Sequence, residues 1–458
     1  MVSFSNLDIV IIATFFLIMT IIGFIPRGKG SNEDYLLSGR KVGLFLFVLT
    51  NVATWYGGIL GVGEFTYRYG IVSWFTQGLP YYIFAIIFAI FFADKIRKAS
   101  LFTIPDKITE VYGRKLGLIT SGLIFILVSP APYLLMIGSL LSMIFNIPLL
   151  YSLIIGAFFS VIYLFRGGYK ADILTDAFEF FIMFIGFIVI VVVAYINYGG
   201  IDFLSSNLPV NHLDLTGGSS PTFILVWFLI ALWTFADPGF HQRCYSAETG
   251  SIAKKGIIIS VFFWALFDFL TTSTGLYSRA ILPGMENPVI SFPLLAEKIL
   301  GSGLKGLFYA ALFATILSTM NSFLFISATT FSNDFIKKLK PDAKEENVKK
   351  YTRWGLLFTS IISIVFAYYA ESVIGLWYTI GSMCIPGLIF VVVTSYYERF
   401  RLTDRMALLQ VVIATSASLI WYLLRQNIQM SYLSDLEPMV VGLIFAMLIQ
   451  FIGKKRVP

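Results

Sequence analysis

Charged side chains are scarce in this sequence. Asp, Glu, Lys and Arg make up only 13% of the 458 residues, whereas hydrophobic residues make up 57%. A soluble globular domain carries about twice that charged fraction, so the composition excludes an ordinary soluble fold. Many apolar runs are long enough for the roughly 20 helical residues that cross a hydrocarbon core. The short alternating segments of a transmembrane β-barrel are not seen, and we predict an all-α polytopic membrane protein.

Histidine and cysteine are almost absent, with two of each. Cys244 and Cys384 lie in or beside apolar segments and are expected to be small core residues. Their spacing gives neither a disulfide framework nor a metal site, and His212 and His241 have no metal partner at ligand spacing. A membrane enzyme needs a nucleophile, a metal set or a paired acid and base in a pocket. With no such motif present, we expect that the protein is not an enzyme.

The hydrophobic residues are grouped into about thirteen segments, which predict thirteen transmembrane helices. Their limits are approximately 7–26, 43–66, 71–94, 116–143, 148–166, 171–198, 222–243, 253–279, 304–331, 351–369, 373–396, 406–424 and 437–453. The first segment has no basic region before it and no small-residue cleavage site, so we expect a retained helix rather than a signal peptide. The loops are no longer than about 20 residues. We therefore expect a single transmembrane domain over 1–458, without the cytoplasmic domain of a signalling receptor.

The net charge of +7 is distributed asymmetrically between the loops. If the N-terminus lies outside, 28 of the 33 Lys and Arg residues fall on the inner side. The outer side then holds only Arg68, Arg279, Lys298, Lys305 and Arg425. This asymmetry follows the positive-inside rule and predicts a cytoplasmic C-terminus, in a bacterial inner membrane. The positive balance thus reflects topology in a lipid bilayer, and no nucleic-acid partner is expected.

Two of the segments contain helix-weakening residues. The second has Gly57, Gly58, Gly61 and Gly63 within a short stretch, which favours an interruption, although small residues also allow close helix packing. The seventh contains Pro238, and a proline inside a helix removes a hydrogen bond. Transporters often use such discontinuous helices, because unwound backbone can coordinate a cation.

The two interrupted segments are five segments apart. This spacing predicts a five-plus-five inverted repeat with broken helices, formed by 43–198 and 222–396. One extra N-terminal helix (7–26) and two extra C-terminal helices (406–453) then flank the repeat. No sequence identity between the halves is visible, so the repeat is inferred from the layout alone.

Polar side chains are concentrated in the otherwise apolar stretch Ala314–Ser322. Ser318 and Ser322 are four residues apart and share one helix face, next to Thr319 and Asn321. Asp176 lies inside another apolar segment, where an ionisable group costs roughly 3 kcal/mol and so needs a reason. Together these oxygens could form a cage for a small hard cation. The pattern indicates a sodium-driven transporter.

Other ionisable residues within the segments have more than one interpretation. Asp172 fits the helix N-terminus that carboxylates favour, whereas Glu179 lies deeper in the same segment. Glu64 and Arg68 are four apart and could pair with each other or form an outer gate. Asp268 could be a structural hydrogen-bonding group or a second ion contact.

Several stretches together resemble the sodium/solute symporter family, whose members carry sugars, amino acids, organic acids and vitamins. They are Glu33–Arg40, Phe102–Asp106 with Tyr112 and Gly113, Arg166–Glu179, Pro238–Ala247 and Ala314–Ser322. Each is weak alone, but the five stand in the right order and on the right sides of the membrane. The resemblance covers about residues 5–400, and it implies a leucine-transporter-type inverted repeat.

The resemblance also implies an ion site. Na⁺ would be bound by the side chains of Ser318 and Thr319 and by backbone carbonyls of Thr315, Leu49 and Val52. A second sodium site, which some members have, would use Asp176, Ser318, Asn321 and Ser322. Asn321 departs from the hydroxyl residue of two-sodium members, and Glu179 stands where the family usually has Gln.

Substrate contacts follow from the same resemblance. They would come from Asn51, Ala53, Tyr56, Trp74, Gln77, Gly78 and Trp233. The expected function is sodium-coupled import of a small polar organic solute, such as a sugar, amino acid or organic acid, by alternating access. No oligomer is required. A proton-coupled or sodium-independent carrier stays open as an alternative because of Glu179, and a membrane receptor is a more distant one.

Overall fold

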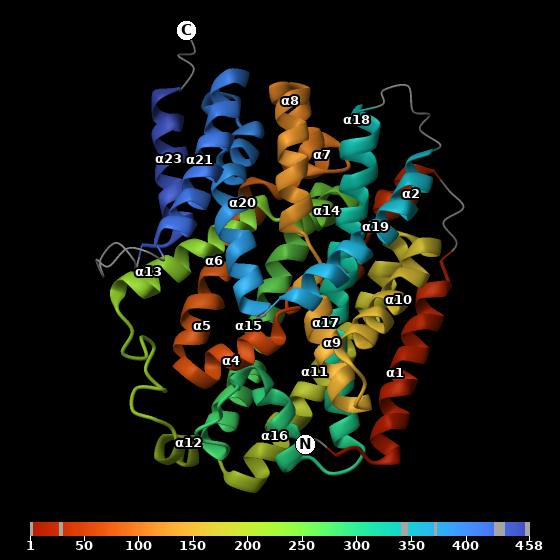
Figure 1. The fold of residues 1–458 in the computed structure, drawn as a ribbon, viewed down its shortest axis with the longest axis vertical. Helices are drawn as coiled ribbons and strands as arrows, with labels where there is room; N and C mark the ends of the chain where they lie inside the picture. The colour runs from red at the N-terminus through yellow and green to blue at the C-terminus, as the bar shows by residue number, and fades with distance from the viewer. Residues whose placement is uncertain (1–2, 27–30, 340–346, 371–372, 426–435, 454–458) are drawn as a thin grey trace.

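The computed structural model describes residues 3–26, 31–339, 347–370, 373–425 and 436–453. Within these ranges the chain is built of helices, shown in Figure 1. The first half contains α1 (Asn6–Phe24), α2 (Asn32–Leu37), η1 (Ser38–Arg40), α3 (Leu44–Ala53), α4 (Ile59–Tyr69), α5 (Val72–Gln77), α6 (Leu79–Phe91), α7 (Ala93–Ala99), α8 (Ile104–Leu127), α9 (Ala131–Phe145), α10 (Leu149–Gly167), α11 (Tyr169–Tyr198) and α12 (Ile201–Asn207). The second half contains α13 (Pro221–Ile230), η2 (Ala231–Ala236), α14 (Pro238–Ser246), α15 (Gly250–Ile281), η3 (Pro288–Ile290), α16 (Ser291–Ile299), α17 (Leu304–Thr329), η4 (Thr330–Ile336), α18 (Lys337–Leu339), α19 (Val348–Tyr369), α20 (Val373–Ser395), η6 (Glu398–Phe400), α21 (Asp404–Arg425) and α23 (Pro438–Ile452).

The predicted all-α membrane fold is confirmed, because each apolar segment coincides with one or more of these helices. Nine helical stretches of the described chain are long and apolar enough to cross a membrane. The predicted limits of the fourth segment, 116–143, were wrong. Its helices begin at Ile104, where the Thr103 side chain accepts a hydrogen bond from the backbone of Asp106. Charged residues in this first part hid it from a search for apolar runs, since a helix can extend beyond the hydrocarbon core.

Both predicted interruptions are present. The second segment consists of α3 and α4, separated at 54–58. In the seventh, α13 tightens into the 3₁₀-helix η2 and then restarts as α14 after Asp237, whose carboxylate caps the new helix. We call these the first and the second break. Gly57 lies where the first break approaches α17, and a Cβ atom there would come within 2.4 Å of the Thr319 Cβ.

Helix α17 is the central element of the fold. Its residues from Phe308 to Thr329 are all buried, and it packs against α11, α1 and α19. Helices α11 and α17 run antiparallel, because Gly186 packs against Ala311 at one end while Asp172 contacts Ser322 at the other. The polar side chains of α17 therefore face protein rather than lipid.

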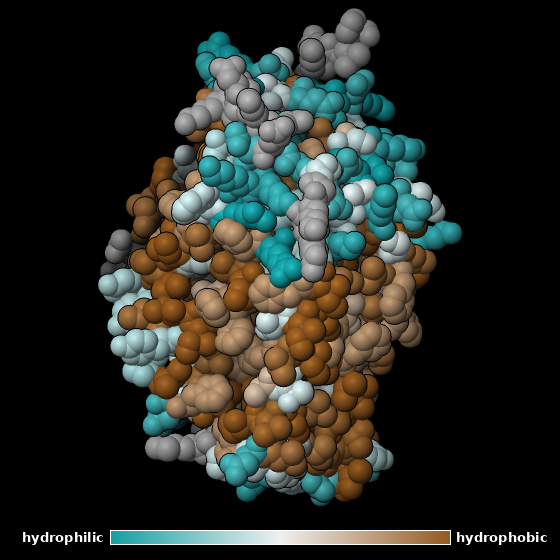
Figure 2. All heavy atoms as spheres, turned by 90° about the vertical axis from the view of Figure 1, so that its right-hand side faces the viewer, coloured by the Kyte–Doolittle hydropathy of each residue, from teal (hydrophilic) through white to brown (hydrophobic). Residues whose placement is uncertain are grey.

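The outer surface has an apolar band and a hydrophilic end. In Figure 2 hydrophobic residues cover the middle and lower part of the face, and hydrophilic residues gather toward the top. Helices α1, α10 and α19 expose large apolar side chains, including Leu17, Phe158 and Ile361. Helix α1 begins at the lower end in Figure 1 and α23 ends at the upper end. This surface belongs to a multi-pass membrane protein.

Candidate functional site

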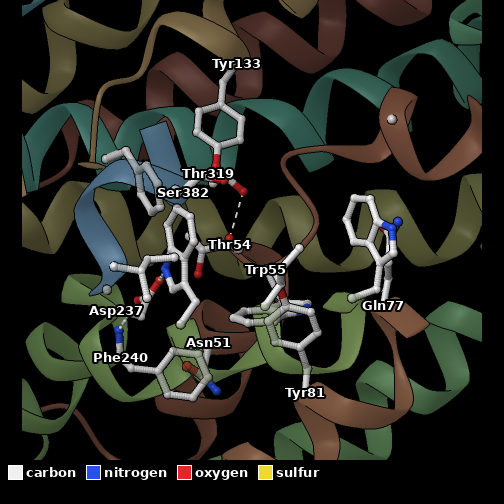
Figure 3. A pocket seen from close by; sticks show the side chains of 18 of the residues that line it. Asn51, Thr54, Trp55, Gln77, Tyr81, Tyr133, Asp237, Phe240, Thr319 and Ser382 are labelled. Carbon is white, nitrogen blue, oxygen red and sulfur yellow. Dashed lines mark hydrogen bonds between the residues drawn. The ribbon is translucent and has the colours of Figure 1, made fainter. Parts of the chain in front are cut away.

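A cavity of about 210 Å³ lies where the two breaks meet. Figure 3 shows the side chains that line it, which come from both breaks and from α9, α17 and α20. Eight of the lining residues are aromatic: Trp55, Phe65, Tyr81, Tyr133, Trp227, Trp233, Phe240 and Phe323. Uncharged polar groups come from Asn51, Thr54, Gln77, Thr319 and Ser382. The cavity has the mixed lining of a small-molecule site, although its volume is below the usual range of about 300–1,000 Å³.

Two charged residues, Asp237 and Arg243, also line the cavity. The Asp237 carboxylate accepts hydrogen bonds from Trp233 Nε1 at 2.9 Å and from the Phe240 backbone at 2.8 Å. Arg243 lies one helical turn beyond the cap, and its Nη2 is 3.6 Å from Asp176 Oδ2. The two residues therefore differ, because Arg243 has an ionic partner and the partners of Asp237 are neutral.

The first break touches α17 at the positions where the sodium site was expected. Thr319 Oγ1 donates a hydrogen bond to the backbone oxygen of Thr54 at 2.8 Å. Ser318 Oγ is buried and has no hydrogen-bond partner in the described part of the chain. Leu49 and Val52 are buried on α3, which packs against α17. An unpaired hydroxyl on a helix that packs against the first break offers an oxygen ligand of the kind that a hard cation prefers.

Thr315, the remaining residue of this expected site, lies one turn before Thr319 on α17. Its hydroxyl donates to the carbonyl of Ala311 in its own helix. Its backbone oxygen, rather than its side chain, is the group expected to contact the ion.

Three of the four residues expected at a second sodium site have other hydrogen-bond partners. Asp176 accepts a hydrogen bond from Thr50, Ser322 donates to Asp172 at 2.6 Å, and Asn321 donates to the Tyr163 hydroxyl. The antiparallel packing of α11 and α17 explains the pairing. A step of four residues along α11 matches a step of four backward along α17, so Ser322 lies level with Asp172 rather than with Asp176.

Arg243 joins this buried polar cluster from the second break. Its Nη2 contacts Thr50 Oγ1 and Ser322 Oγ, both at 3.1 Å. Glu179 lies further along α11, fully buried, and neither of its carboxylate oxygens has a partner among the described residues. Within those residues no group of three or more His, Cys, Asp or Glu is placed to hold a metal ion.

Of the seven expected substrate contacts, the structure places Asn51, Gln77 and Trp233 at the cavity. It places Ala53, Tyr56, Trp74 and Gly78 elsewhere. The Tyr56 hydroxyl donates to the Trp264 carbonyl at 2.8 Å, and Trp74 Nε1 donates to the Tyr82 hydroxyl at 3.3 Å. Ala53 is fully buried, and Gly78 packs against Asp268. The unwound backbone turns Trp55 into the cavity and the next residue, Tyr56, away from it.

The remaining polar residues have local partners. Glu64 and Arg68 form a 3.0 Å ion pair with each other, which agrees with mutual pairing. The Tyr82 hydroxyl donates to Asp268, which agrees with a structural hydrogen-bonding role for Asp268. Cys244 and Cys384 are buried and free, as expected. His241 Nε2 is 3.1 Å from the Phe235 carbonyl oxygen, and His212 Nε2 is 3.3 Å from that of Tyr67.

Sequence reasoning missed several cavity residues. Asp237 had a signal, because a carboxylate directly before Pro238 caps a new helix inside a membrane segment. Tyr81 and Tyr133 had none, since aromatic residues are common throughout this sequence. They are brought to the cavity only by the packing of α6 and α9 around the first break.

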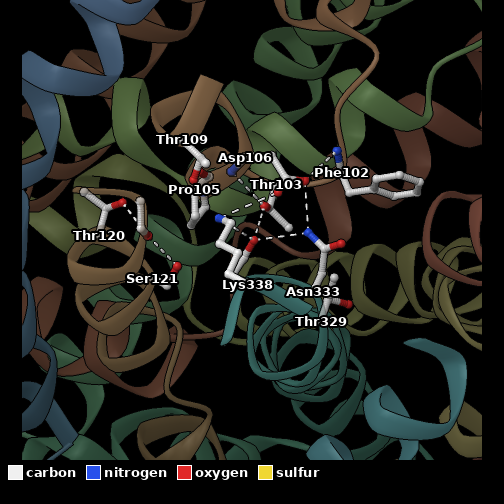
Figure 4. Close-up of polar contacts among 12 residues, drawn as sticks. Phe102, Thr103, Pro105, Asp106, Thr109, Thr120, Ser121, Thr329, Asn333 and Lys338 are labelled. Atoms are coloured by element: carbon white, nitrogen blue, oxygen red, sulfur yellow. Dashed lines mark hydrogen bonds and ion pairs between the residues drawn. The ribbon is translucent and has the colours of Figure 1, made fainter. Parts of the chain in front are cut away.

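Toward the upper end of the molecule, α8 is joined to η4 and α18 by a set of polar contacts that we call the latch (Figure 4). It consists of Thr103 and Asp106 at the start of α8, Asn333 and Asp334 in η4, and Lys338 in α18. Thr103 donates to Asp334 at 2.7 Å, and Asn333 donates to Asp106 at 2.9 Å. Lys338 Nζ lies 3.4 Å from Asp334 and 3.7 Å from Asp106. The latch therefore joins two helices far apart in the sequence.

Two broken helices around a central cavity, in a helical membrane bundle, define a secondary transporter. The sequence comparison identifies which kind: the chain belongs to the Sodium:solute symporter family, whose model matches residues 35–413. It is 25% identical to the high-affinity choline transporter 1 of Caenorhabditis elegans over 414 residues, or 81% of this chain and 70% of the relative. It is 26% identical to the sodium/proline symporter of Staphylococcus aureus strain COL over 380 residues, or 78% and 73%. The chain is thus a sodium-coupled solute symporter.

Solved structures show the same fold. A substrate-bound, outward-open Na⁺-coupled sialic acid symporter superposes with a TM-score of 0.85 at 16% identity, covering 99% of this chain and 98% of the other. Mhp1, a nucleobase-cation-symport-1 family transporter with bromovinylhydantoin bound, gives 0.63 at 12% identity, covering 92% and 93%. At such low identity the likeness concerns the fold alone, and it confirms the leucine-transporter-type architecture.

Proposed function

We propose that this chain imports a small polar organic solute together with Na⁺, binding the solute in the central cavity and the ion between the first break and α17. The ion ligands are the side chains of Ser318 and Thr319 and the backbone carbonyls of Thr315, Leu49 and Val52. One observation carries the proposal: Thr319 lines the cavity and also donates to the unwound backbone at Thr54. The ion site and the solute site therefore share a wall.

This shared wall provides a physical basis for coupling. An ion that ties the first break to α17 would order the backbone that presents Asn51, Thr54 and Trp55 to the solute. Because linkage is reciprocal, the solute would raise the affinity for Na⁺ by the same factor. The membrane potential contributes about 2.3 kcal/mol per charge per 100 mV to the inward movement of the ion.

The same contacts support one sodium ion rather than two. The guanidinium of Arg243 lies 3.6 Å from Asp176 and would repel a second cation there. Ser322 and Asn321 are already engaged with Asp172 and Tyr163. These positions, expected to bind a second Na⁺, are better suited to holding α11, α14 and α17 together.

We further propose a membrane orientation with the upper end in the cytoplasm and the N-terminus outside. The distribution of Lys and Arg between the loops supports it. Seven of the 28 residues on the inner side lie outside the described residues, namely Arg27, Lys29, Lys340, Lys344, Lys454, Lys455 and Arg456. We also propose the inverted repeat formed by 43–198 and 222–396. The two breaks support it, because each interrupts the first long helix of its half.

A proton-coupled carrier is the second candidate, and Glu179 favours it. A fully buried carboxyl group with two unpartnered oxygens is costly when charged, so it could carry a proton through the cycle. Uptake driven by a pH gradient in the absence of Na⁺, and lost in Glu179→Gln, would support this candidate over sodium coupling.

The sodium site can be tested without a known solute. We would titrate purified protein with NaCl against KCl at constant ionic strength and follow thermal stability and tryptophan fluorescence, to which Trp55 in the first break contributes. We expect a saturable response to Na⁺ whose half-maximal concentration rises at least about tenfold, or ~1.4 kcal/mol, in Ser318→Ala and in Thr319→Ala.

Ser327→Ala is the matched control. Ser327 is also a buried serine of α17, but it contacts Thr359 of α19 rather than the first break. Its sodium dependence should equal that of the wild type. Unchanged sodium dependence in both Ser318→Ala and Thr319→Ala would remove these residues from the ion site.

A further inference from the structure

Asp237 carries the one carboxylate among the residues that line the cavity, and its hydrogen-bond partners carry no charge. It is only 7% exposed, and its two hydrogen-bond donors, the indole of Trp233 and the backbone of Phe240, are neutral. In the described ranges no Lys or Arg forms an ion pair with it. Capping α14 does not require a charge, since Ser, Thr and Asn cap equally well. A buried carboxylate without a cation is costly, which points to a ligand.

The Arg243 guanidinium lies near Asp237, since both face Gly239, but its ion pair is formed elsewhere. The guanidinium is directed to the polar cluster of α11, where it faces Asp176 at 3.6 Å. Its Nη1 donates to the Gly239 carbonyl, and its Nη2 contacts Thr50 and Ser322. One buried guanidinium thus serves a cluster that contains three carboxyl groups, those of Asp172, Asp176 and Glu179. The cavity is left with a carboxylate that has no ion pair of its own, while its guanidinium is shared among several carboxyl groups.

Aromatic rings surround the position that a ligand would occupy near Asp237. Trp55 lies with its ring centroid 5.0 Å from that of Tyr81 and 5.4 Å from that of Phe240, and Trp233 donates to the carboxylate itself. Figure 3 shows Trp55, Tyr81 and Phe240 around the same space as Asp237. Aromatic faces attract organic cations, and cages of this kind recognise quaternary ammonium groups. Rings and carboxylate therefore favour the same ligand chemistry.

A second feature concerns the uncharged part of the ligand. Asn51 lines the cavity, is 3% exposed, and its Nδ2 has no hydrogen-bond partner among the described residues. A buried amide donor without a partner is rare in folded proteins. Its N–H groups would suit an acceptor oxygen on the solute, such as that of a hydroxyl group, and Gln77 offers a second amide at the cavity wall.

We propose that the solute is a small organic cation, with a quaternary or protonated amine held by Asp237 and the surrounding rings and an acceptor oxygen held by Asn51. The inference rests on the proposed function, since it takes the cavity as the solute site. It narrows that function, because it disfavours sugars, which lack the charge, and organic anions, which Asp237 would repel. A zwitterionic amino acid would bring a carboxylate for which the cavity offers the amides of Asn51 and Gln77 but no unpaired cation.

The test measures binding of four probes to the purified protein in NaCl by titration calorimetry: choline, tetramethylammonium, L-proline and D-galactose. We expect saturable binding of choline, weaker binding of tetramethylammonium, which lacks the hydroxyl group, and no binding of the other two. Asp237→Asn keeps the cap and the size of the side chain but removes its charge. It should weaken choline binding at least tenfold while leaving the Na⁺ response intact.

Two further variants show whether the effect of Asp237→Asn is specific to the cavity. Asp268→Asn removes a carboxyl group outside the cavity and should leave choline affinity unchanged. Asn51→Ala should weaken choline binding more than tetramethylammonium binding, because only choline offers an acceptor oxygen. The inference would be overturned if proline or galactose bound saturably and neither ammonium probe bound. The ammonium probes would be tested up to about 10 mM, a concentration that would detect even weak binding.

Failure of the cation inference and failure of sodium symport would be visible separately. If Na⁺ stabilises the protein through Ser318 but neither ammonium probe binds in NaCl, the inference on solute charge is wrong and symport stands. If choline binds equally well in NaCl and KCl and Na⁺ has no effect of its own, the cation site stands and sodium coupling is lost. Choline affinity that is unchanged in Asp237→Asn would remove this carboxylate from the site.

Discussion

The cavity and the latch hold their polar groups in opposite ways. At the cavity, Asp237 has no ionic partner and Asn51 keeps a free donor. At the latch, both carboxylates lie within ion-pair distance of Lys338, and most polar side chains are hydrogen-bonded. The groups that we propose to receive a ligand are left unmatched, whereas the groups that join α8 to η4 and α18 are matched by the protein itself.

Further contacts accompany the latch at the upper end. Arg40 donates to the Tyr245 carbonyl at 3.1 Å, and Tyr245 and Tyr396 share a 2.9 Å hydrogen bond between their hydroxyl groups. The backbone of Val42 pairs with the segment after α14. A single hydrogen bond contributes a net of only about 0.5–1.5 kcal/mol, because water can replace the partner. Such contacts can therefore hold a closed state and still be exchanged for water when that end opens.

Arg243 lies between the two regions, and its loss should have the largest effect. Arg243→Gln would leave Asp176 buried without an ionic partner, and breaking a buried pair in this way costs roughly 3–5 kcal/mol. We expect a clear fall in the midpoint of thermal unfolding and loss of the Na⁺ response. Thermal unfolding of the purified protein, with and without NaCl, measures both.

The double variant Arg243→Gln/Asp176→Asn is the control for this prediction. Removing both charges eliminates the unpaired carboxylate, so the double variant should recover most of the lost stability. If Arg243→Gln is as stable as the wild type, the ion pair contributes nothing and the cluster is not what holds α14 against α11.

Opening the latch should have an intermediate effect. Asp334→Ala removes the acceptor shared by Thr103, Asn333 and Lys338, and a lost buried acceptor costs about 1–3 kcal/mol. The upper end should then open more often. Cys244 can report this, because it is fully buried on α14, next to Tyr245, whose hydroxyl donates to the Thr103 carbonyl. We expect faster alkylation of Cys244 by a maleimide, measured in a Cys384→Ala background.

Na⁺ gives a second readout of the same equilibrium. If the ion favours the state with the upper end closed, NaCl should slow the alkylation of Cys244 in Asp334→Ala more than KCl does. An alkylation rate equal to that of the parent protein, in either salt, would mean that the latch does not control access from this end.

Sequence reasoning predicted the helices well because hydrophobic runs are a local property of the chain. It also found the polar face of α17, since Ser318 and Ser322 are spaced by one helical turn. The start of α8 was missed because its first turns are charged. The cavity residues were predicted only in part, because no helical period fixes which side chains point inward once the backbone unwinds at Trp55 and Tyr56.

The polar cluster shows a second limit of the sequence. Spacing along α11 and α17 put Asp176 and Ser322 on polar faces, but the pairing between the two faces depends on their relative register. Packing of Gly186 against Ala311 sets that register, and a shift of one turn moves Ser322 from Asp176 to Asp172. Arg243 enters from a third helix, and its contacts depend on the second break.

The ion pair of Glu64 and Arg68, at the end of α4 away from the latch, should have the smallest effect. Both residues belong to one helix, four residues apart, and Arg68 is about half exposed. Such pairs are worth about 0–1 kcal/mol, and a pair within one helix cannot hold two helices together. Glu64→Gln should change the unfolding midpoint only slightly and leave Cys244 alkylation unchanged. If it instead altered alkylation or choline binding as strongly as Asp334→Ala, this pair would act as a gate, and the contrast between a matched latch and an unmatched cavity would fail.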